Sequence, residues 1–179
     1  MIAALLVIAT IAPPRQQLAT AAESQVGVTT IYDPAYRILK YPGGDLPKER
    51  GVCADVIVRA FRALGVDLQV AVHEDMTRHF GDYPRMWGLQ KPDRNIDHRR
   101  VPNLMRYFAR LGKSVPIDGS YEPGDVVAWR LPGGLYHIGI LSTQRPHGGG
   151  DYLVVHNIGA GVQVEDVLRS FRIIGHYRW

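Results

Sequence analysis

The chain contains a single cysteine, Cys53, among its 179 residues. One cysteine cannot form an intrachain disulfide, so its thiol is either a small buried apolar group or a reactive one. Lys and Arg residues are scattered and never form the run that follows a phosphate backbone. The formal net charge of +4 suits an anionic partner such as a cell-wall polymer, whereas the scatter of the charges argues against nucleic-acid binding.

Long apolar runs, repeats and internal linkers are also missing, and the length fits one domain. The apolar run at residues 2–12 is too short to span a bilayer and resembles the core of a secretory signal. Ala19-Thr20-Ala21 has the small-x-small pattern of a cleavage site, although no Lys or Arg precedes the apolar run. We therefore expect a signal peptide over 1–22, a mature domain over 23–179 without stable membrane insertion, and a periplasmic or secreted protein.

No complete metal or nucleotide motif is present. The His-Glu pair at 73–74 has its next histidine at His79, two residues too late for the zinc motif His-Glu-x-x-His. Gly159-Ala160-Gly161 lacks the rest of a dinucleotide fingerprint and is typical of a turn. We expect neither a metal ion nor another cofactor.

Cys53 lies at the start of a stretch, residues 51–65, whose apolar residues recur at helical spacing. Gly65 suits the left-handed conformation that ends helices. The thiol therefore falls in a first helical turn, where free N–H groups and the helix dipole favour a thiolate. This position predicts a pKa below the ordinary value of about 8.5 and suits a nucleophile.

The remaining pattern changes from helical to alternating after Ser114. Helices are predicted over 22–30, 71–79 and 101–111, with a short extended segment at 67–70 and a surface loop over 83–97. Strands are predicted over 126–129, 137–141, 153–157 and 173–179. Helices followed by antiparallel strands indicate an α+β fold with the cysteine helix packed across the sheet.

Two histidines follow the cysteine in an order that suits catalysis. His137 opens an apolar strand after a glycine-rich turn, and His156 lies in the next strand, which can pair beside it. A cysteine nucleophile needs a base within hydrogen-bond reach and a third polar group to orient that base. Each histidine taken singly could instead be a hydrogen-bonded structural residue.

This order of residues resembles the NlpC/p60 superfamily of papain-like cell-wall cysteine peptidases. The resemblance lies in the helix-start cysteine, the strand entry at 122–129, the base strand His137-Ile138-Gly139-Ile140 and the orienting strand Val155-His156-Asn157. The motifs at 51–55, 72–76, 95–104 and 175–178 are more specifically similar to the bacterial domain of unknown function 1287. That likeness covers nearly the whole mature chain.

The resemblance implies that Cys53 is the nucleophile, His137 the base and His156 the orienting residue. Asn157 is an alternative to His156, because the loop at 145–151 enlarges the spacing between the histidines. A tyrosine upstream of the cysteine helps to hold the site in that superfamily, and Tyr41 is the proposed match.

Two further residues are candidates for substrate contact. Asp55 stands where the superfamily has the glycine of Cys-Ser-Gly; it could bind a substrate amine or cap a neighbouring group. Arg99, in the cluster at 97–100, could clamp a substrate carboxylate or form an ion pair at a helix start.

These features together predict an exported, monomeric cysteine hydrolase that cleaves an amide bond in peptidoglycan stem peptides or another peptide. Two alternatives remain. An acyltransferase would use the same residues and pass the acyl group to an amine or alcohol. A non-catalytic wall-binding module would keep the groove without needing a thiolate.

Overall fold

A computed structural model of the protein describes residues 14–179. Its helices are α1 (Pro14–Glu23), α2 (Cys53–Ala63), α3 (Leu68–Arg78) and α4 (Val101–Arg110), with short 3-10 turns η1 (Phe80–Asp82), η2 (Asp97–Arg99) and η3 (Pro132–Gly134). The strands are β1 (Ile31–Tyr32), β2 (Arg50–Gly51), β3 (Val126–Arg130), β4 (Tyr136–Leu141), β5 (Val154–His156), β6 (Gln163–Glu165) and β7 (Arg172–Tyr177). β1 and β2 form a short parallel pair, and the other strands form one antiparallel sheet in the order β6-β5-β4-β3-β7. The predicted α+β class with an antiparallel sheet is confirmed.

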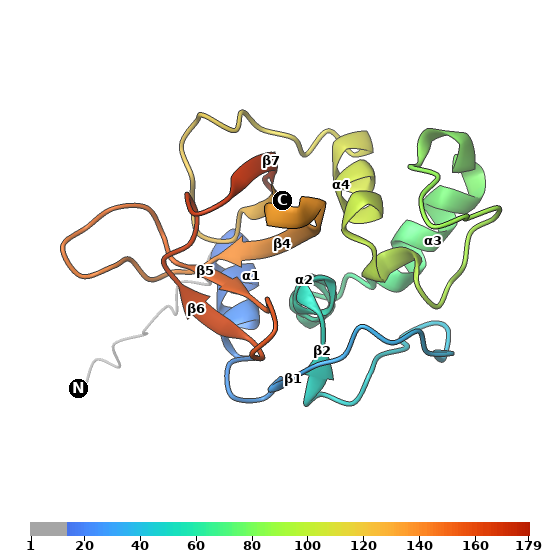
Figure 1. Ribbon diagram of the computed structural model, residues 1–179, viewed down its shortest axis with the longest axis horizontal. Helices are drawn as coiled ribbons and strands as arrows, with labels where there is room; N and C mark the ends of the chain where they lie inside the picture. Colours follow the sequence, from blue (N-terminus) through green and yellow to red (C-terminus); the bar gives the residue numbers. More distant parts are fainter. Residues whose placement is uncertain (1–13) are drawn as a thin grey trace, which may run out of the picture.

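The helices cover the sheet unequally. In Figure 1, α2 lies between the sheet and the α3–α4 pair, and β1 and β2 lie below it. α2 contacts β4 and α1 as well as α3 and η2, so it joins the sheet to the α3–α4 pair. The start of this central helix is where Cys53 lies.

Alternation along the strands gives the sheet two differently used faces. Val126, Ala128, Ile138 and Ile140 point to the large core that contains α2 and α4. Their neighbours Val127, Trp129 and Leu141 form a smaller core on the other face. A residue's parity in β3 or β4 therefore decides whether its side chain faces α2.

Two predicted elements differ from the structure. The segment at 67–70 is helical, because the Asp67 side chain caps α3 by accepting the N–H of Gln69 at 3.0 Å. The helix predicted over 22–30 is wrong, since α1 ends at Glu23 and hydrogen-bonded turns follow it. β6 was not predicted, because three residues are too few for a periodic signal.

The domain boundary expected at residue 22 falls inside α1. The apolar run at 2–12 lies outside the described residues, but α1 is part of the folded domain. Leu18 and Ala19 are fully buried and α1 contacts α2 and β4. Cleavage after Ala21 would remove both side chains from the core, so the folded domain includes α1 and extends before residue 23.

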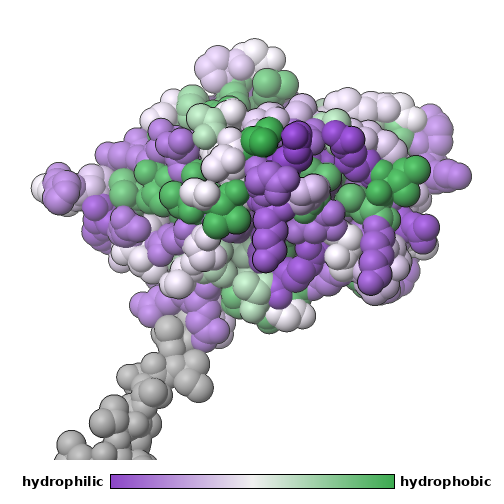
Figure 2. All heavy atoms as spheres, turned by 90° about the horizontal axis from the view of Figure 1, so that it is seen from below, coloured by the Kyte–Doolittle hydropathy of each residue, from purple (hydrophilic) through white to green (hydrophobic). Residues whose placement is uncertain are grey.

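Within residues 14–179, the helices are all too short or too polar to cross a bilayer. Figure 2 shows the molecule from below, the side on which β1 and β2 lie. Hydrophilic side chains on this face separate the apolar ones into several groups. This face therefore carries no single continuous apolar surface.

Candidate functional site

Cys53 is the first residue of α2, and a buried ion pair holds the helix start in place. The Oδ2 atom of Asp55 accepts the backbone N–H of Val52 at 2.7 Å. The Arg99 guanidinium binds both Asp55 oxygens, at 2.9 and 3.0 Å, and also donates to the carbonyls of Asp33 and Ala35. Asp55 and Arg99 therefore bind each other and not a substrate. This corrects the expectation that Asp55 binds a substrate amine and that Arg99 clamps a substrate carboxylate.

The thiol itself is a neutral group in this structure. Cys53 is only 5% exposed, and burial raises the pKa of its thiol to about 12. The N–H groups of Ile138, Ala54 and Cys53 point to the sulfur and lower the pKa, but they offset only part of the burial effect. The expected lowering of the pKa is wrong, because sequence position shows the helix start but not the apolar residues enclosing it.

The strand beside the sulfur is β4. Because the N–H of Ile138 points to Sγ of Cys53, the sulfur lies against the backbone of the residue next to His137. The His137 side chain is on the sheet face of Trp129, with 5.8 Å between their ring centroids. Among the described residues, none forms a hydrogen bond with Nδ1 of His137, and this includes the thiol of Cys53.

The two predicted histidines are joined to each other. His137 Nε2 lies 2.8 Å from His156 Nδ1, and His156 Nε2 lies 2.8 Å from the Glu165 carboxylate. An ionised carboxylate can only accept, so His156 carries its proton on Nε2 and accepts at Nδ1. His137 must then donate from Nε2. This chain leaves the lone pair of His137 Nδ1 free to take a proton.

Both imidazoles are neutral. Burial, with the neighbouring His156 adding to it, lowers the pKa of His137 to about 3. Burial also lowers the pKa of His156, although the Glu165 carboxylate opposes the change. A neutral thiol and a neutral imidazole are therefore the resting state, instead of a thiolate and an imidazolium.

Asn157 has a different role from the one proposed for it as an alternative. Its Nδ2 donates to the carbonyl of Gly51 at 3.1 Å, so it ties the end of β5 to the segment before Cys53. Successive strand residues face opposite sides. His156, not Asn157, therefore reaches His137.

The tyrosine near the cysteine is Tyr32. Tyr41 packs edge-on against His73 with 5.6 Å between ring centroids, and Arg94 lies over its other side. Tyr32 is the second residue of β1, pairs with Gly51 of β2 and lines the same pocket as Cys53. Burial and the charge of the Asp55 carboxylate raise the pKa of Tyr32, so its hydroxyl stays protonated. Tyr41 therefore does not line the pocket of Cys53, whereas Tyr32 does.

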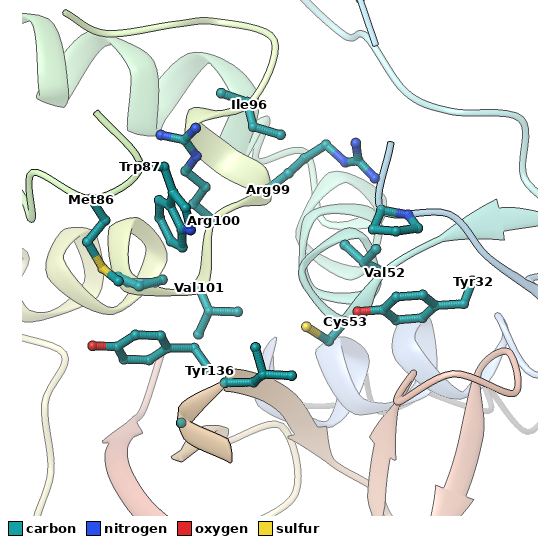
Figure 3. Close-up of a pocket in the computed structure, with 14 residues that line it drawn as sticks. Tyr32, Val52, Cys53, Met86, Trp87, Ile96, Arg99, Arg100, Val101 and Tyr136 are labelled. Atoms are coloured by element: carbon teal, nitrogen blue, oxygen red, sulfur yellow. The ribbon is translucent and has the colours of Figure 1, made fainter. Parts of the chain in front are cut away.

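An open pocket of about 310 Å³ gives access to this helix start. Its floor holds Cys53, and its walls come from η2, the start of α4, the 86–87 segment and the turn before β4. Figure 3 shows the sulfur of Cys53 directed into the space between Val101 and Tyr136. A ligand in this pocket could therefore reach the nucleophile.

The zinc-like histidines serve the fold. His73 Nδ1 lies 2.9 Å from the buried Asp97 carboxylate, and His79 lies 3.9 Å from Asp75. Within the part of the chain that the structure describes, no three His, Cys, Asp or Glu side chains come together as a metal site would need.

Sequence reasoning missed Glu165 and Tyr32. Glu165 is the last residue of the three-residue strand β6 and belongs to no sequence motif. Only the pairing of β6 with β5 brings its carboxylate to His156. Tyr32 is a nearer upstream tyrosine in space, although Tyr41 is nearer in sequence.

The chain belongs to a family whose function is unknown. Residues 19–179 match the family described as "Domain of unknown function (DUF1287)". The chain is also similar to the "Uncharacterized protein YijF" of Escherichia coli (strain K12), with 54% identity over 165 residues, 90% of this chain and 80% of that protein. The predicted membership of this family is confirmed, whereas the wider resemblance to NlpC/p60 peptidases stays a prediction.

Proposed function

We propose that this protein is an exported, papain-like cysteine hydrolase that cleaves an amide bond in peptidoglycan stem peptides. The observation that carries the proposal is the hydrogen-bond chain Glu165–His156–His137, which ends in a free Nδ1 lone pair. That histidine immediately precedes Ile138, whose N–H points to the sulfur of Cys53. These contacts support Cys53 as the nucleophile, His137 as the base and the His156–Glu165 pair as the groups that orient the base.

Activation would be a proton transfer between two neutral groups. As the sulfur attacks the substrate carbonyl, the thiol proton passes to Nδ1 of His137, and the Glu165–His156 pair stabilises the imidazolium. Hydrogen bonds of this kind are often long in a free enzyme and shorten when substrate binds. A resting neutral pair therefore does not oppose the mechanism.

The developing oxyanion would lie at the start of α2. The N–H groups of Cys53 and Ala54 are in the first turn and have no helical carbonyl to bind. They can stabilise the negative charge of a tetrahedral intermediate. The Tyr32 hydroxyl lines the same pocket and is a further donor.

The reaction then balances in two steps. The C–N bond breaks, the amine takes the proton from His137, and the acyl group stays on Cys53 as a thioester. Water next loses a proton to His137 and attacks the thioester, which releases a carboxylic acid and restores the thiol. The resemblance to NlpC/p60 peptidases and the leader-like residues 2–12 support a substrate in the cell wall and an active monomer outside the cytoplasm.

Purified protein incubated with muropeptides, with products identified by mass spectrometry, tests the proposal. We expect cleavage of one amide bond by the wild-type protein and none by Cys53→Ala, with unchanged thermal melting of the variant. Transfer of the acyl group to an added amine would indicate an acyltransferase, and binding without conversion would indicate a wall-binding module. Full activity in Cys53→Ala would contradict any thiol mechanism.

A further inference from the structure

The pocket above Cys53 has an unbalanced charge. Its lining contains Arg99 and Arg100 but neither Asp nor Glu. Arg99 is neutralised, because Asp55 binds it through two hydrogen bonds with both side chains buried. The positive charge left in the pocket wall is that of Arg100.

Arg100 has no anionic partner within residues 14–179. Its guanidinium carbon lies 4.7 Å from the centroid of the Trp87 ring, and its Nη1 is buried without a hydrogen-bond acceptor. Figure 3 shows the two neighbouring arginines pointing in opposite directions, Arg99 toward the β1 side and Arg100 alongside Trp87. A buried donor without an acceptor is costly unless a ligand supplies the acceptor.

Two helix starts also face this pocket. Val52 and Cys53 at the start of α2 line it, and so do Val101 and Pro102 at the start of α4. Each helix carries a partial positive charge at this end. The N-termini therefore add to the positive potential around Arg100.

We propose that Arg100 binds a carboxylate group of the substrate, next to the amide bond that Cys53 attacks. This inference rests on the proposed hydrolase function and defines its substrate as an acidic peptide. The guanidinium carbon lies over the Trp87 ring, and the planar fork of a guanidinium can bind a carboxylate through two parallel hydrogen bonds. Arg100 replaces Arg99 as the carboxylate clamp.

Binding to an inactive protein tests this proposal separately from catalysis. Calorimetric titration would use Cys53→Ala protein and the stem tripeptide L-alanyl-γ-D-glutamyl-L-lysine, together with two variants of the peptide. One variant is amidated at the D-glutamate α-carboxyl and the other at the C-terminus, so the pair identifies which carboxylate is bound. We expect one amidation to weaken binding by about tenfold, the loss of one charge-assisted pair.

The matched protein variants each remove one arginine, either Arg100 just before α4 or Arg106 within it. Arg100→Gln in the Cys53→Ala background should weaken binding of the unamidated peptide by about tenfold and abolish the difference in affinity between unamidated and amidated peptides. Arg106→Gln makes the same change of charge at an exposed position, 4.0 Å from Asp82, and should bind like its parent. Arg100→Lys, which keeps the charge but not the fork, should fall between them, and melting curves would report the fold of each variant.

Equal binding of all three peptides would overturn the proposal, as would equal effects of Arg100→Gln and Arg106→Gln or no binding of any peptide. Hydrolysis is measured separately on the wild-type protein. Binding with the expected preference but without hydrolysis would overturn the proposed function and leave the carboxylate site standing. Hydrolysis at the same rate in wild-type and Arg100→Gln proteins would overturn the carboxylate site and leave the proposed function standing.

Discussion

The helix side and the strand side of the site hold their charges in different ways. On the helix side, the ion pair of Arg99 and Asp55 is enclosed, with only 2% and 4% of the two side chains exposed. On the strand side, the hydrogen-bond chain starts at Glu165, whose side chain is 41% exposed, and runs inward through His156 to His137.

This difference separates a positioning role from a proton-transfer role. The enclosed pair cannot exchange protons or ligands with solvent, so it fixes where Val52 and the start of α2 lie. The histidine chain consists of groups that can change their protonation, and its outer carboxylate contacts water. Substitutions in the Asp55–Arg99 pair should therefore affect stability, and those in the chain of Glu165, His156 and His137 should affect rate.

The largest effect is expected from the histidines. His137→Ala should lower the cleavage rate by about 10²- to 10⁴-fold, since the thiol loses its proton acceptor and the leaving amine its donor. His156→Ala should cost less, because it only orients the base. Steady-state rates on muropeptides, with melting curves as the folding control, would measure both. A His156→Ala protein as active as the wild type would contradict the orienting role of His156.

The ion pair should dominate stability. Arg99→Met leaves the Asp55 carboxylate buried and unpaired, which should lower the free energy of unfolding by about 3–5 kcal/mol in urea titrations. The control, Arg78→Met, removes an exposed pair with Glu74 at 3.7 Å and should cost less than about 1 kcal/mol. Similar losses in the two variants would mean that enclosure of the Asp55–Arg99 pair has no special effect.

Glu165→Gln should reduce activity without a large change in melting temperature. The amide can still bond to His156 but lacks the charge that stabilises the imidazolium, so a loss of about tenfold or more is expected. Asp166→Asn, one residue further and exposed, is the matched control and should retain the wild-type rate. A Glu165→Gln protein as active as Asp166→Asn would remove the carboxylate from the mechanism.

Acid should destabilise the fold through the buried histidines. Burial lowers the pKa of His137 to about 3 and that of His98 to about 4, whereas an unfolded histidine titrates near 6.5. The unfolded chain thus binds more protons below pH 6.5, and stability is lost as the pH falls toward the folded pKa values. Each histidine can contribute up to about 1.4 kcal/mol per pH unit.

Urea titrations between pH 7 and pH 4.5 would measure this slope. His137→Gln should make this slope less steep than that of the wild-type protein. The same slope in His137→Gln and the wild-type protein would show that His137 does not titrate with the predicted sign.

Patterns over several residues were readable from the sequence because they follow from local geometry. The spacing of apolar residues and Gly65 predicted the cysteine helix, and in the structure α2 ends just before Gly65, whose φ is +82°. Alternation predicted β3, β4, β5 and β7 as well as the α+β class. The order of Cys53, His137 and His156 along the chain similarly predicted the candidate site residues.

Tertiary contacts decided the rest, since burial and pairing depend on residues far apart in the chain. Arg99 and Arg100 are adjacent and chemically identical, yet only Arg99 meets Asp55. Glu165 reaches His156 through the pairing of two strands, and the pKa of Cys53 is raised by surrounding apolar residues that its own helix does not supply. A sequence determines the kinds of groups available and their local spacing, whereas the free energy of a charge depends on everything packed around it.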